Sequence, residues 1–411
     1  DLNGDGKLEI IFGGYDNNVY VTTWQGDAFP GWPVNLGTDV FSSPAVADLN
    51  GDGTAEIVIA LKDDSADPQY GRILVFDSSG NVKPGWPRET PGQVYPSPAL
   101  ADLDGDGDLE IILGCGNYNG GDPARSRLFA LNADGTDVAG WPVNMPDTLY
   151  ASPAVGDLDG DGLPEIVIGC YDGNIYAYRG TGVSVPGWPV ATGDSVYSSA
   201  AITDIEGDGM AEVCVASDDG FVYLLRHDGQ AVAGYPIETG ARVFASVCVD
   251  DMDADGDLEI AAASSVGDVF LWNDAGKAAR TTHWSKFRST LHNTGVYMPA
   301  STNPPVVILF GYWNTYITAP DGGTMTLLTA VIDNDGPADI ATVELYYDGV
   351  PTGIYLADDG ANGDFAAGDG VFGLVLPFPG GAVPPTSLML QVMATDGSGA
   401  TSALAPYLEV N

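Results

Sequence analysis

The sequence DLDGDGDLE, residues 102–110, is one of six related nine-residue copies along the chain. The other five are DLNGDGKLE from Asp1, DLNGDGTAE from Asp48, DLDGDGLPE from Asp157, DIEGDGMAE from Asp204 and DMDADGDLE from Asp251. All six fit the form D-x-[DNE]-[GA]-D-G-x-x-E, and together they contain 24 of the 57 acidic residues. A solvated acidic surface would show no fixed spacing. The pattern therefore indicates a specific chemical role for these loops.

The spacing suits a cage of oxygen atoms around a cation. Side chains at positions 1, 3 and 5 of a tight loop point inward, Gly at positions 4 and 6 permits the turn, and position 7 offers its backbone carbonyl. An all-oxygen cage of variable coordination favours Ca²⁺ over Mg²⁺ or Zn²⁺. We therefore expect about six calcium sites. The expected ligands are Asp1, Asn3, Asp5 and Glu9; Asp48, Asn50, Asp52 and Glu56; Asp102, Asp104, Asp106 and Glu110; Asp157, Asp159, Asp161 and Glu165; Asp204, Glu206, Asp208 and Glu212; and Asp251, Asp253, Asp255 and Glu259.

An EF-hand is the nearest alternative to this interpretation, and the residues after the loop argue against it. In an EF-hand the closing acid stands at position 12 and a helix follows. Here the Glu at position 9 begins short β-branched segments, such as EIVIG at residues 165–169, which are typical of strands.

The loops recur at intervals of 47, 54, 55, 47 and 47 residues, and other features keep the same period. A Gly-aromatic-Pro turn recurs at residues 31–33, 85–87, 140–142, 187–189 and 234–236. A period in the forties with several short strands per unit predicts an all-β propeller of four-stranded blades. In the fourth unit we expect strands at 151–157, 165–170, 174–178 and around 188–190. The first strand of each unit is rich in Ser, Ala and Pro, as a crowded strand beside a central axis requires.

With these loops placed between strands one and two, residues 1–297 resemble the FG-GAP/VCBS calcium-loop propellers, which are related to the integrin α-subunit head. The resemblance implies seven blades, whereas six units are visible. Glu206 departs from the pattern and could weaken the fifth site. Residues 283–297, HWSKFRSTLHNTGVY, look like a closing element of related propellers. The first unit lacks a small-residue strand before Asp1, so we expect a processed or truncated chain, or another segment in that place.

A change of composition at residues 301–305, STNPP, predicts a linker between a propeller at 1–300 and a second domain at 306–411. Short alternating strands in this second domain predict an immunoglobulin-like β-sandwich. Its Asp/Gly-rich loop could hold one more cation, or its Asp residues could cap turns. The candidate ligands there are Asp358, Asp359, Asn362, Asp364 and Asp369.

The formal net charge of −43, with 14 Lys and Arg residues, argues against a nucleic-acid partner, because few cations are present to release counterions. No run of 18 apolar residues predicts a membrane span. Extracellular calcium modules bind with dissociation constants of about 10⁻⁴–10⁻³ M. Such sites would be empty in the cytosol, so we expect an extracellular or cell-surface location.

An aromatic residue precedes each loop after the first by seven positions: Phe41, Tyr95, Tyr150, Tyr197 and Phe244. We expect these rings on the face opposite the calcium loops, where insertions at residues 62–71 and 117–126 also fall. There they could stack on sugars or hold a protein loop. The alternative is that they only pack one blade against the next.

The sequence offers little for catalysis. His227, His283 and His292 are the only histidines, and no spacing predicts a catalytic triad, phosphate loop or His/Cys metal site. We expect the four cysteines, at 115, 170, 214 and 248, to be free thiols. The expected function is a non-enzymatic extracellular calcium-binding interaction or adhesion protein that binds a glycan or a protein. The alternatives are a self-assembling subunit of a surface layer or filament and a calcium-dependent polysaccharide-acting enzyme.

Overall fold

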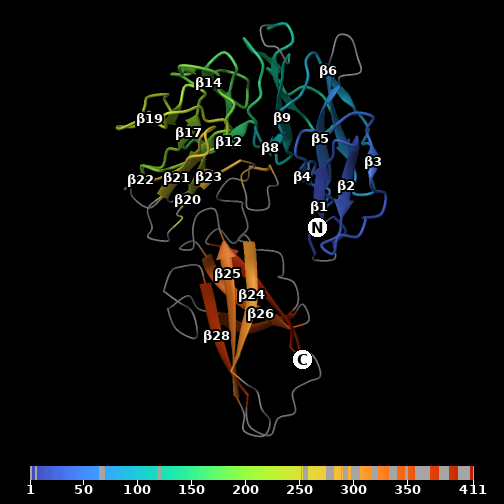
Figure 1. The fold of residues 1–411 in the computed structure, drawn as a ribbon. Coiled ribbons are helices and arrows are strands. Elements are labelled where there is room, and N and C mark those ends of the chain that lie inside the picture. The colour runs from blue at the N-terminus through green and yellow to red at the C-terminus, as the bar shows by residue number, and fades with distance from the viewer. Residues whose placement is uncertain are drawn as a thin grey trace. The chain divides into compact units, whose positions relative to one another are not determined.

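The chain forms antiparallel β-sheets, and its described residues contain no α-helix (Figure 1). The structure is a computed structural model. It describes residues 2–4, 7–63, 70–117, 122–250, 252, 258–274, 282–287, 289 and 295–297, and the strands between 306 and 410. Two compact units comprise mainly Leu8–Pro299 and Ala300–Asn411. Within the described ranges, no helix has the length and apolar character needed to cross a membrane.

In its described residues, the first unit contains six sheets in chain order. The first sheet has three strands: β1 (Ile10–Gly13), β2 (Asn18–Thr22) and β3 (Val34–Asn35). The second has β4 (Ala45–Ala47), β5 (Glu56–Asp63), β6 (Tyr70–Phe76) and β7 (Arg88–Thr90), and the third has β8 (Ala99–Ala101), β9 (Glu110–Cys115), β10 (Arg127–Leu131) and β11 (Val143–Asn144). The fourth has β12 (Ala154–Gly156), β13 (Glu165–Gly169), β14 (Asn174–Arg179) and β15 (Val190–Ala191).

The fifth sheet has β16 (Ala201–Thr203), β17 (Glu212–Ala216), β18 (Phe221–Leu225) and β19 (Ile237–Glu238), and β23 (Thr282–Trp284) adds to it beside β16. The sixth has β20 (Cys248–Asp250), β21 (Leu258–Ala263) and β22 (Val269–Asp274). A series of six small antiparallel sheets is the expected propeller-like repeat fold.

The second unit contains two antiparallel sheets. One has the order β24 (Val306–Thr315), β25 (Gly323–Ile332), β28 (Val371–Phe378); the other has the order β27 (Val350–Leu356), β26 (Ile340–Tyr347), β29 (Leu388–Asp396), β30 (Leu408–Val410). The assignment of an immunoglobulin-like sandwich to this unit, like the expected domain boundaries, stays a prediction.

In the second to fifth sheets the nine-residue loop joins the first and second strands. The closing Glu pairs with the last residue of the first strand, as in Ala47↔Glu56, Ala101↔Glu110 and Gly156↔Glu165. The loops therefore lie at equivalent places in successive sheets, as the spacing predicts.

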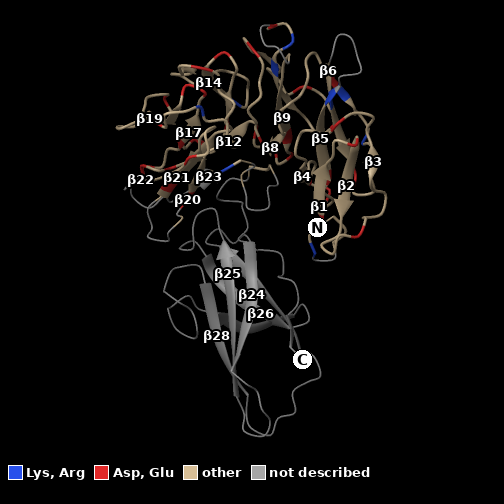
Figure 2. Cartoon of the chain, in the orientation of Figure 1, with Lys and Arg blue, Asp and Glu red and all other residues tan. Residues whose placement is uncertain are grey.

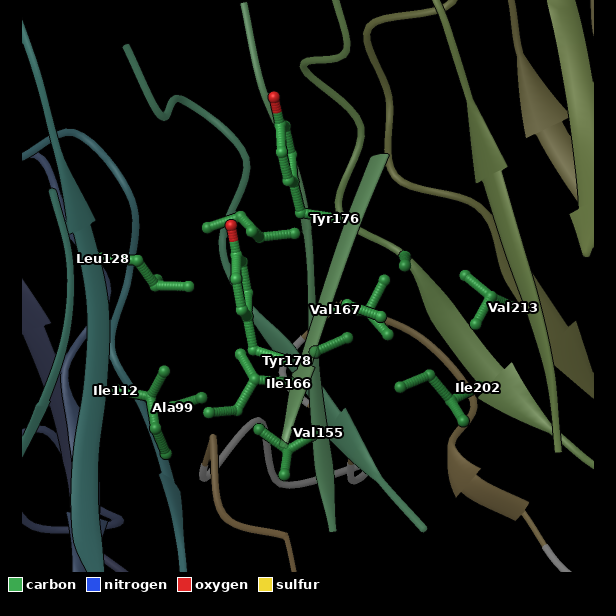
Figure 3. Packing of buried hydrophobic residues seen from close by; sticks show 14 of the residues in the cluster. Ala99, Ile112, Leu128, Val155, Ile166, Val167, Tyr176, Tyr178, Ile202 and Val213 are labelled. Atoms are coloured by element: carbon green, nitrogen blue, oxygen red, sulfur yellow. The ribbon is translucent and has the colours of Figure 1, made fainter. Parts of the chain in front are cut away.

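The hydrophobic core lies between neighbouring sheets. The second strand of each sheet is apolar, which allows it to be buried on both faces. Side chains alternate across a strand, so a strand covered on both faces must be apolar throughout. In Figure 3, Ile166 of β13 points toward Ile112 and Ala99 of the third sheet, whereas Val167 points toward Ile202 and Val213 of the fifth sheet. All six are buried.

Two repeated hydrogen bonds connect neighbouring sheets. Before each first strand, a Ser backbone N–H donates to the Ser Oγ of the next sheet: Ser43 to Ser97, Ser97 to Ser152, Ser152 to Ser199 and Ser199 to Ser246, at 2.9, 2.9, 3.0 and 3.3 Å. In the Gly-Trp-Pro turns, the indole Nε1 donates to a turn carbonyl of the next sheet: Trp32 to Ser78, Trp86 to Ala133, Trp141 to Gly180 and Trp188 to His227.

The segment expected to close the propeller runs beside first strands of three sheets. Trp284 pairs with Ile202 in β16, and the Ser285 carbonyl accepts from the Val249 N–H in β20. Farther along, the Gly295 carbonyl accepts from the Leu100 N–H of β8 at 2.7 Å. Residues 288 and 290–294 of this segment lie outside the described residues.

Among the described residues, the first sheet has no strand in the place that β4, β8, β12 and β16 take in the following sheets. Ile10, which follows the closing Glu in this sheet, is 55% exposed, whereas its equivalent Ile57 in the second sheet is fully buried.

Candidate metal-binding loops and aromatic surface

The first Asp of the motif shapes the loop by accepting backbone hydrogen bonds. Asp157 Oδ1 accepts from the N–H groups of Gly160 and Asp161 at 2.8 and 3.2 Å, and its Oδ2 accepts from Gly162 at 2.8 Å. Gly160 and Gly162 have positive φ angles of 74° and 91°, which explains why glycine stands there. Asp102 makes the equivalent bonds in the third sheet, and Asp48 and Asp204 make bonds to the fifth and sixth residues of their loops.

The closing Glu is buried in every loop except the first, where Glu9 is partly exposed, and a backbone N–H holds it in place. One of its oxygens accepts from the N–H of the second motif residue in all six copies: Leu2 to Glu9, Leu49 to Glu56, Leu103 to Glu110, Leu158 to Glu165, Ile205 to Glu212 and Met252 to Glu259, at 2.7–3.0 Å. The second oxygen of Glu259 is buried and has no hydrogen-bond partner among the described residues.

Acidic oxygens converge most closely in the loops of the third and fourth sheets. Asp102, Asp104 and Glu110 each offer an oxygen within 4.8 Å of the other two, and so do Asp157, Asp159 and Glu165. Burial, together with neighbouring Asp carboxylates, raises the pKa of Glu110 and of Glu165 to about 7. Concentrated negative charge of this kind favours a bound cation.

The residues present fit a cation that prefers oxygen. The ligand atoms are carboxylates, and the loop shape is already formed by its own hydrogen bonds. In addition, Asp159 Oδ1 is buried with no hydrogen-bond partner in the described part of the chain. A buried carboxylate oxygen without a hydrogen bond is costly, so Asp159 Oδ1 is available to a cation, although Arg179 pairs with the other oxygen of the same carboxylate. Ca²⁺ suits such a set of ligands better than a metal that prefers nitrogen or sulfur.

Basic side chains distinguish the loops from one another, and the sequence-based prediction did not include them. Lys83 Nζ lies 2.5 Å from Glu56 Oε1. Arg179 donates to Asp159 Oδ2 at 2.7 Å, and Arg226 donates to both oxygens of Glu206 at 2.5 and 2.8 Å. Both arginines stand 14 residues after the closing Glu of their loop, and this spacing could have revealed them.

Several expected ligands lie outside the described residues. They are Asp1 and Asp5 of the first loop, Asp251, Asp253 and Asp255 of the sixth loop, and Asp358, Asp359, Asn362, Asp364 and Asp369 of the second unit. The metal sites expected at these positions stay predictions.

Four of the five expected aromatic residues form a continuous series across neighbouring sheets. The ring centroids of Tyr95 and Tyr150 lie 4.8 Å apart, those of Tyr150 and Tyr197 5.1 Å, and those of Tyr197 and Phe244 5.7 Å. Phe41 instead contacts Tyr15, at 4.8 Å, and Lys62 Nζ lies 4.4 Å from the Phe41 ring centroid. The alternative interpretation, packing between sheets, is thus part of what these rings do.

Tyr171 belongs to the same aromatic surface, which we define as Tyr95, Tyr150, Tyr171, Tyr197 and Phe244. Its ring lies 5.8 Å from Tyr150 and 5.7 Å from Tyr197. The sequence-based reasoning missed Tyr171, although it stands six residues after its closing Glu, as Tyr15 does. Tyr171 is 37% and Phe244 46% exposed, so part of the surface is accessible.

The aromatic surface and the acidic loops lie at opposite ends of the first strands. Tyr150 stands four residues before β12 begins, whereas the motif at Asp157 follows directly after β12 ends. Beside Tyr197, the carboxyl of Asp218 is 8% exposed, and its Oδ1 has no hydrogen-bond partner within the described residues. Burial raises the pKa of Asp218, against the opposing effect of Arg242.

The described cysteines are free, as expected. Cys115 Sγ donates to the Arg125 carbonyl at 3.2 Å, and Cys170 Sγ lies near the Asp147 and Thr148 carbonyls. Burial raises the pKa of Cys115 to about 11 and also raises that of Cys170. These thiols are therefore poor nucleophiles at neutral pH.

Comparison with known proteins identifies the repeat. Residues 1–59, 157–215 and 204–262 match the model of the FG-GAP-like repeat. No curated protein sequence matches the chain. The repeats and the series of antiparallel sheets support an FG-GAP-type propeller-like fold.

The chain also resembles several solved structures at low identity. A chain of the crystal structure of BBS1N in complex with ARL6DN is 15% identical, with a TM-score of 0.45 over 81% of this chain and 87% of that chain. The Vibrio cholerae biofilm matrix protein Bap1 is 16% identical, with a TM-score of 0.38 over 99% and 71%. Saccharomyces cerevisiae Sqt1 is 13% identical, with a TM-score of 0.47 over 64% and 68%.

Proposed function

We propose that the chain is a non-enzymatic, extracellular interaction protein whose loops bind Ca²⁺ and whose aromatic surface binds a protein partner. The observation that carries the proposal is the convergence of three acidic side chains in each of two equivalent loops, one of which leaves Asp159 Oδ1 buried and unpaired. FG-GAP-like repeats, which are typical of interaction propellers, support the same function.

Calcium has a structural role in this proposal. Two like charges about 5 Å apart at an effective dielectric constant of about 20 repel by about 3 kcal/mol. An ion held by Asp102, Asp104, Asp106 and Glu110 would remove this repulsion and connect the first strand of the sheet to the second. Binding to the folded form alone stabilises it by about 1.4 kcal/mol per site at a tenfold excess over the dissociation constant.

The extracellular location follows from the expected affinity. Loops of this kind that bind with dissociation constants of about 10⁻⁴–10⁻³ M fill only where calcium is plentiful. The acidic surface suits such a location, since Asp and Glu far outnumber Lys and Arg over the first unit (Figure 2).

The aromatic surface is the proposed contact for the partner. Four of its rings come from the segments before the first strands of four successive sheets, and Tyr171 comes from the turn between β13 and β14. They lie at the opposite end of the first strands from the acidic loops. Tyrosine rings combine apolar area with a polar hydroxyl, which is why they are frequent in protein interfaces. A glycan that stacks on the same rings is the other outcome of the test below.

The calcium proposal is tested by comparing Asp106→Asn with Asp108→Asn. Both changes remove one charge from the same loop, but only Asp106 occupies an expected ligand position. We expect the wild type to bind calcium in equilibrium dialysis and to melt at a higher temperature with calcium than with a chelator. Asp106→Asn should weaken binding at one site, whereas Asp108→Asn should not. Equal melting temperatures with and without calcium would contradict the proposal.

The partner proposal is tested with the calcium-loaded protein on panels of extracellular proteins and of glycans. The double variant Tyr95→Ala/Tyr150→Ala should lose the binding that the wild type shows. Trp24→Ala, which removes an exposed ring outside the aromatic surface, should keep it. Binding that survives the double variant would overturn the role of this surface, and binding to glycans alone would replace the protein partner by a sugar.

A further inference from the structure

The loop at residues 204–212 differs from the other described loops because a basic side chain takes both oxygens of an expected ligand. Arg226 Nε donates to Glu206 Oε2 at 2.5 Å, and Arg226 Nη2 donates to Glu206 Oε1 at 2.8 Å. Such a paired arrangement is the strongest form of Arg–carboxylate contact. No oxygen of Glu206 is left without a cationic partner.

In the loop at residues 157–165, the arginine contacts only one oxygen of the equivalent carboxylate, that of Asp159. Arg179 donates to Asp159 Oδ2 at 2.7 Å and to Asp161 Oδ2 at 3.3 Å, and its Nη1 lies 4.0 Å from Glu165 Oε1. Asp159 Oδ1 is buried and has no hydrogen-bond partner among the described residues. Asp159, Asp157 and Glu165 still bring oxygens within 4.8 Å of one another. The corresponding group of three is not found at Asp204, Glu206 and Glu212. Arg179 thus contacts one oxygen of each of three carboxylates and, unlike Arg226, does not take both oxygens of any of them.

Position in the sheet explains why arginine reaches these two loops. Arg179 pairs with the closing Glu165 across β13 and β14. Leu225 pairs with Val213, so Arg226 stands next to the pair at the equivalent place beside Glu212. In the third sheet Leu131 pairs with Ile111, and the next residue is Asn132, which carries no charge. The longer side chain of Glu206, compared with Asp159, allows the carboxylate to meet the guanidinium with both oxygens.

We propose that the loop at residues 204–212 holds the guanidinium of Arg226 in place of a calcium ion, while the loops at 102–110 and 157–165 bind the ion. This inference rests on the proposed calcium function. An ion entering the fifth loop would lose the Glu206 ligand and would lie close to a fixed positive charge. Its affinity should be at least tenfold weaker than that of the loop at 102–110.

As a consequence, the loop at residues 204–212 of the fifth sheet should keep its folded conformation when calcium is scarce. Glu212 Oε2 accepts from the N–H groups of both Ile205 and Glu206, at 3.0 and 3.1 Å. Asp204 accepts from Asp208 and Gly209 at 3.0 and 2.9 Å. With Arg226 on Glu206, the loop is closed by contacts within the protein. The loop at 102–110 has no basic partner among the described residues and should loosen without its ion.

Hydrogen exchange of the wild-type chain, with calcium and with a chelator, tests the inference loop by loop. We expect chelation to raise amide exchange at least tenfold in residues 102–110 and 157–165 and to leave residues 204–212 unchanged. A calcium-dependent change at 204–212 equal to that at 102–110 would overturn the inference. If no loop responds and no calcium binds, the proposed function itself fails, so the two failures are distinguishable.

A variant designed to gain a calcium site in the fifth loop provides the second measurement. The double variant Glu206→Asp/Arg226→Asn reproduces the ligands of the third-sheet loop and the uncharged Asn132 beside it. We expect it to bind one more calcium ion per chain than the wild type, and its residues 204–212 to become sensitive to chelation. Arg179→Asn is the matched control, because it removes the same charge from a loop that already binds and should leave the number of ions unchanged. A folded double variant with the wild-type number of ions would contradict the inference.

Discussion

The backbone N–H of Ser97 donates a hydrogen bond at 2.9 Å to the Oγ of Ser152, which belongs to the next sheet. Ser152 uses its own N–H in the same way toward Ser199. The repeated Ser before the first strand thus gives the third, fourth and fifth sheets one donor and one acceptor each for their two neighbours. Small size, which the crowded first strands require, is only part of the reason why Ser recurs there.

Replacing Ser152 by Ala should destabilise the protein by about 1–3 kcal/mol, because the Ser97 N–H would be left buried without an acceptor. Ser97 and Ser152 are both buried. Denaturant unfolding in the presence of calcium measures the change. Ser79→Ala, in an exposed turn of the second sheet, is the control and should change stability by less than about 0.5 kcal/mol. Equal stability of Ser152→Ala and the wild type would show that the serine contacts contribute nothing.

Replacing Gly187 by Ala should cost about 3 kcal/mol or more. Gly187 has a φ of 93°, and a Cβ there would lie 1.8 Å from the Asp228 carbonyl oxygen of the next sheet. The substitution therefore combines a strained backbone with a forced separation of two sheets.

Gly26→Ala separates the two effects. Gly26 has a φ of 88°, but nothing lies within 4 Å of a Cβ built on it. We expect this control to lose only about 1–2 kcal/mol, which is the cost of the left-handed conformation. If the two variants lose equal stability, close packing at the Gly-Trp-Pro turn is unimportant.

Sequence reasoning was most successful where the period of the chain carries the information. The nine-residue motif predicted both the first turn of each sheet and the order of strands, because loop chemistry and strand pattern repeat together. The predicted ends of the strands were less accurate than the predicted order of the strands. In the fourth sheet the first strand begins at Ala154 rather than residue 151, and Trp188 lies in a turn before β15. Its ring is placed by the hydrogen bond to His227 in the next sheet, which no local pattern describes.

Contacts between sheets explain most of what the sequence could not predict. The series of rings from Tyr95 to Phe244 follows from a shared position before the first strands, but Tyr171 enters from a different turn. Likewise, Arg226 comes from a third strand and reaches a loop between the first and second strands. Both residues stand at a repeated distance from the closing Glu. These two positions are hard to recognise in the sequence because the residue type there changes from one repeat unit to the next.

The cysteines provide a test of the packing between sheets. Cys115, Cys170 and Cys214 are fully buried, whereas Cys248 is partly exposed. Because only the thiolate reacts, and burial raises the pKa of the Cys115 thiol to about 11, an alkylating reagent at pH 8 should modify the native protein first at Cys248. Mass spectrometry of the labelled peptides reads out the order. All four should react in denaturant, and rapid native labelling of Cys115 or Cys170 would contradict the described core.

The stability of the metal-free protein should fall as the pH rises from about 4.5 to about 7. Burial and neighbouring acids raise the pKa of Glu110, Glu165 and Glu212 from an ordinary value of 4.5 to about 7 in the folded chain. Within this window the folded state binds more protons than the unfolded state, so the free energy of unfolding decreases with pH. Carboxyls whose pKa is lowered, such as Asp77 and Glu206, have the opposite effect, but they act at lower pH.

Denaturant unfolding of protein freed of metal on a chelating resin, at pH 5, 6, 7 and 8, measures this slope. Saturating calcium should abolish it, since an ion in the loop favours the charged form of each Glu and thereby compensates for burial. Glu110→Gln should make the slope shallower in the metal-free protein, because the amide stays neutral at every pH. A metal-free protein whose stability instead rises between pH 5 and 7 would show that the buried carboxyls are already neutralised from within the chain.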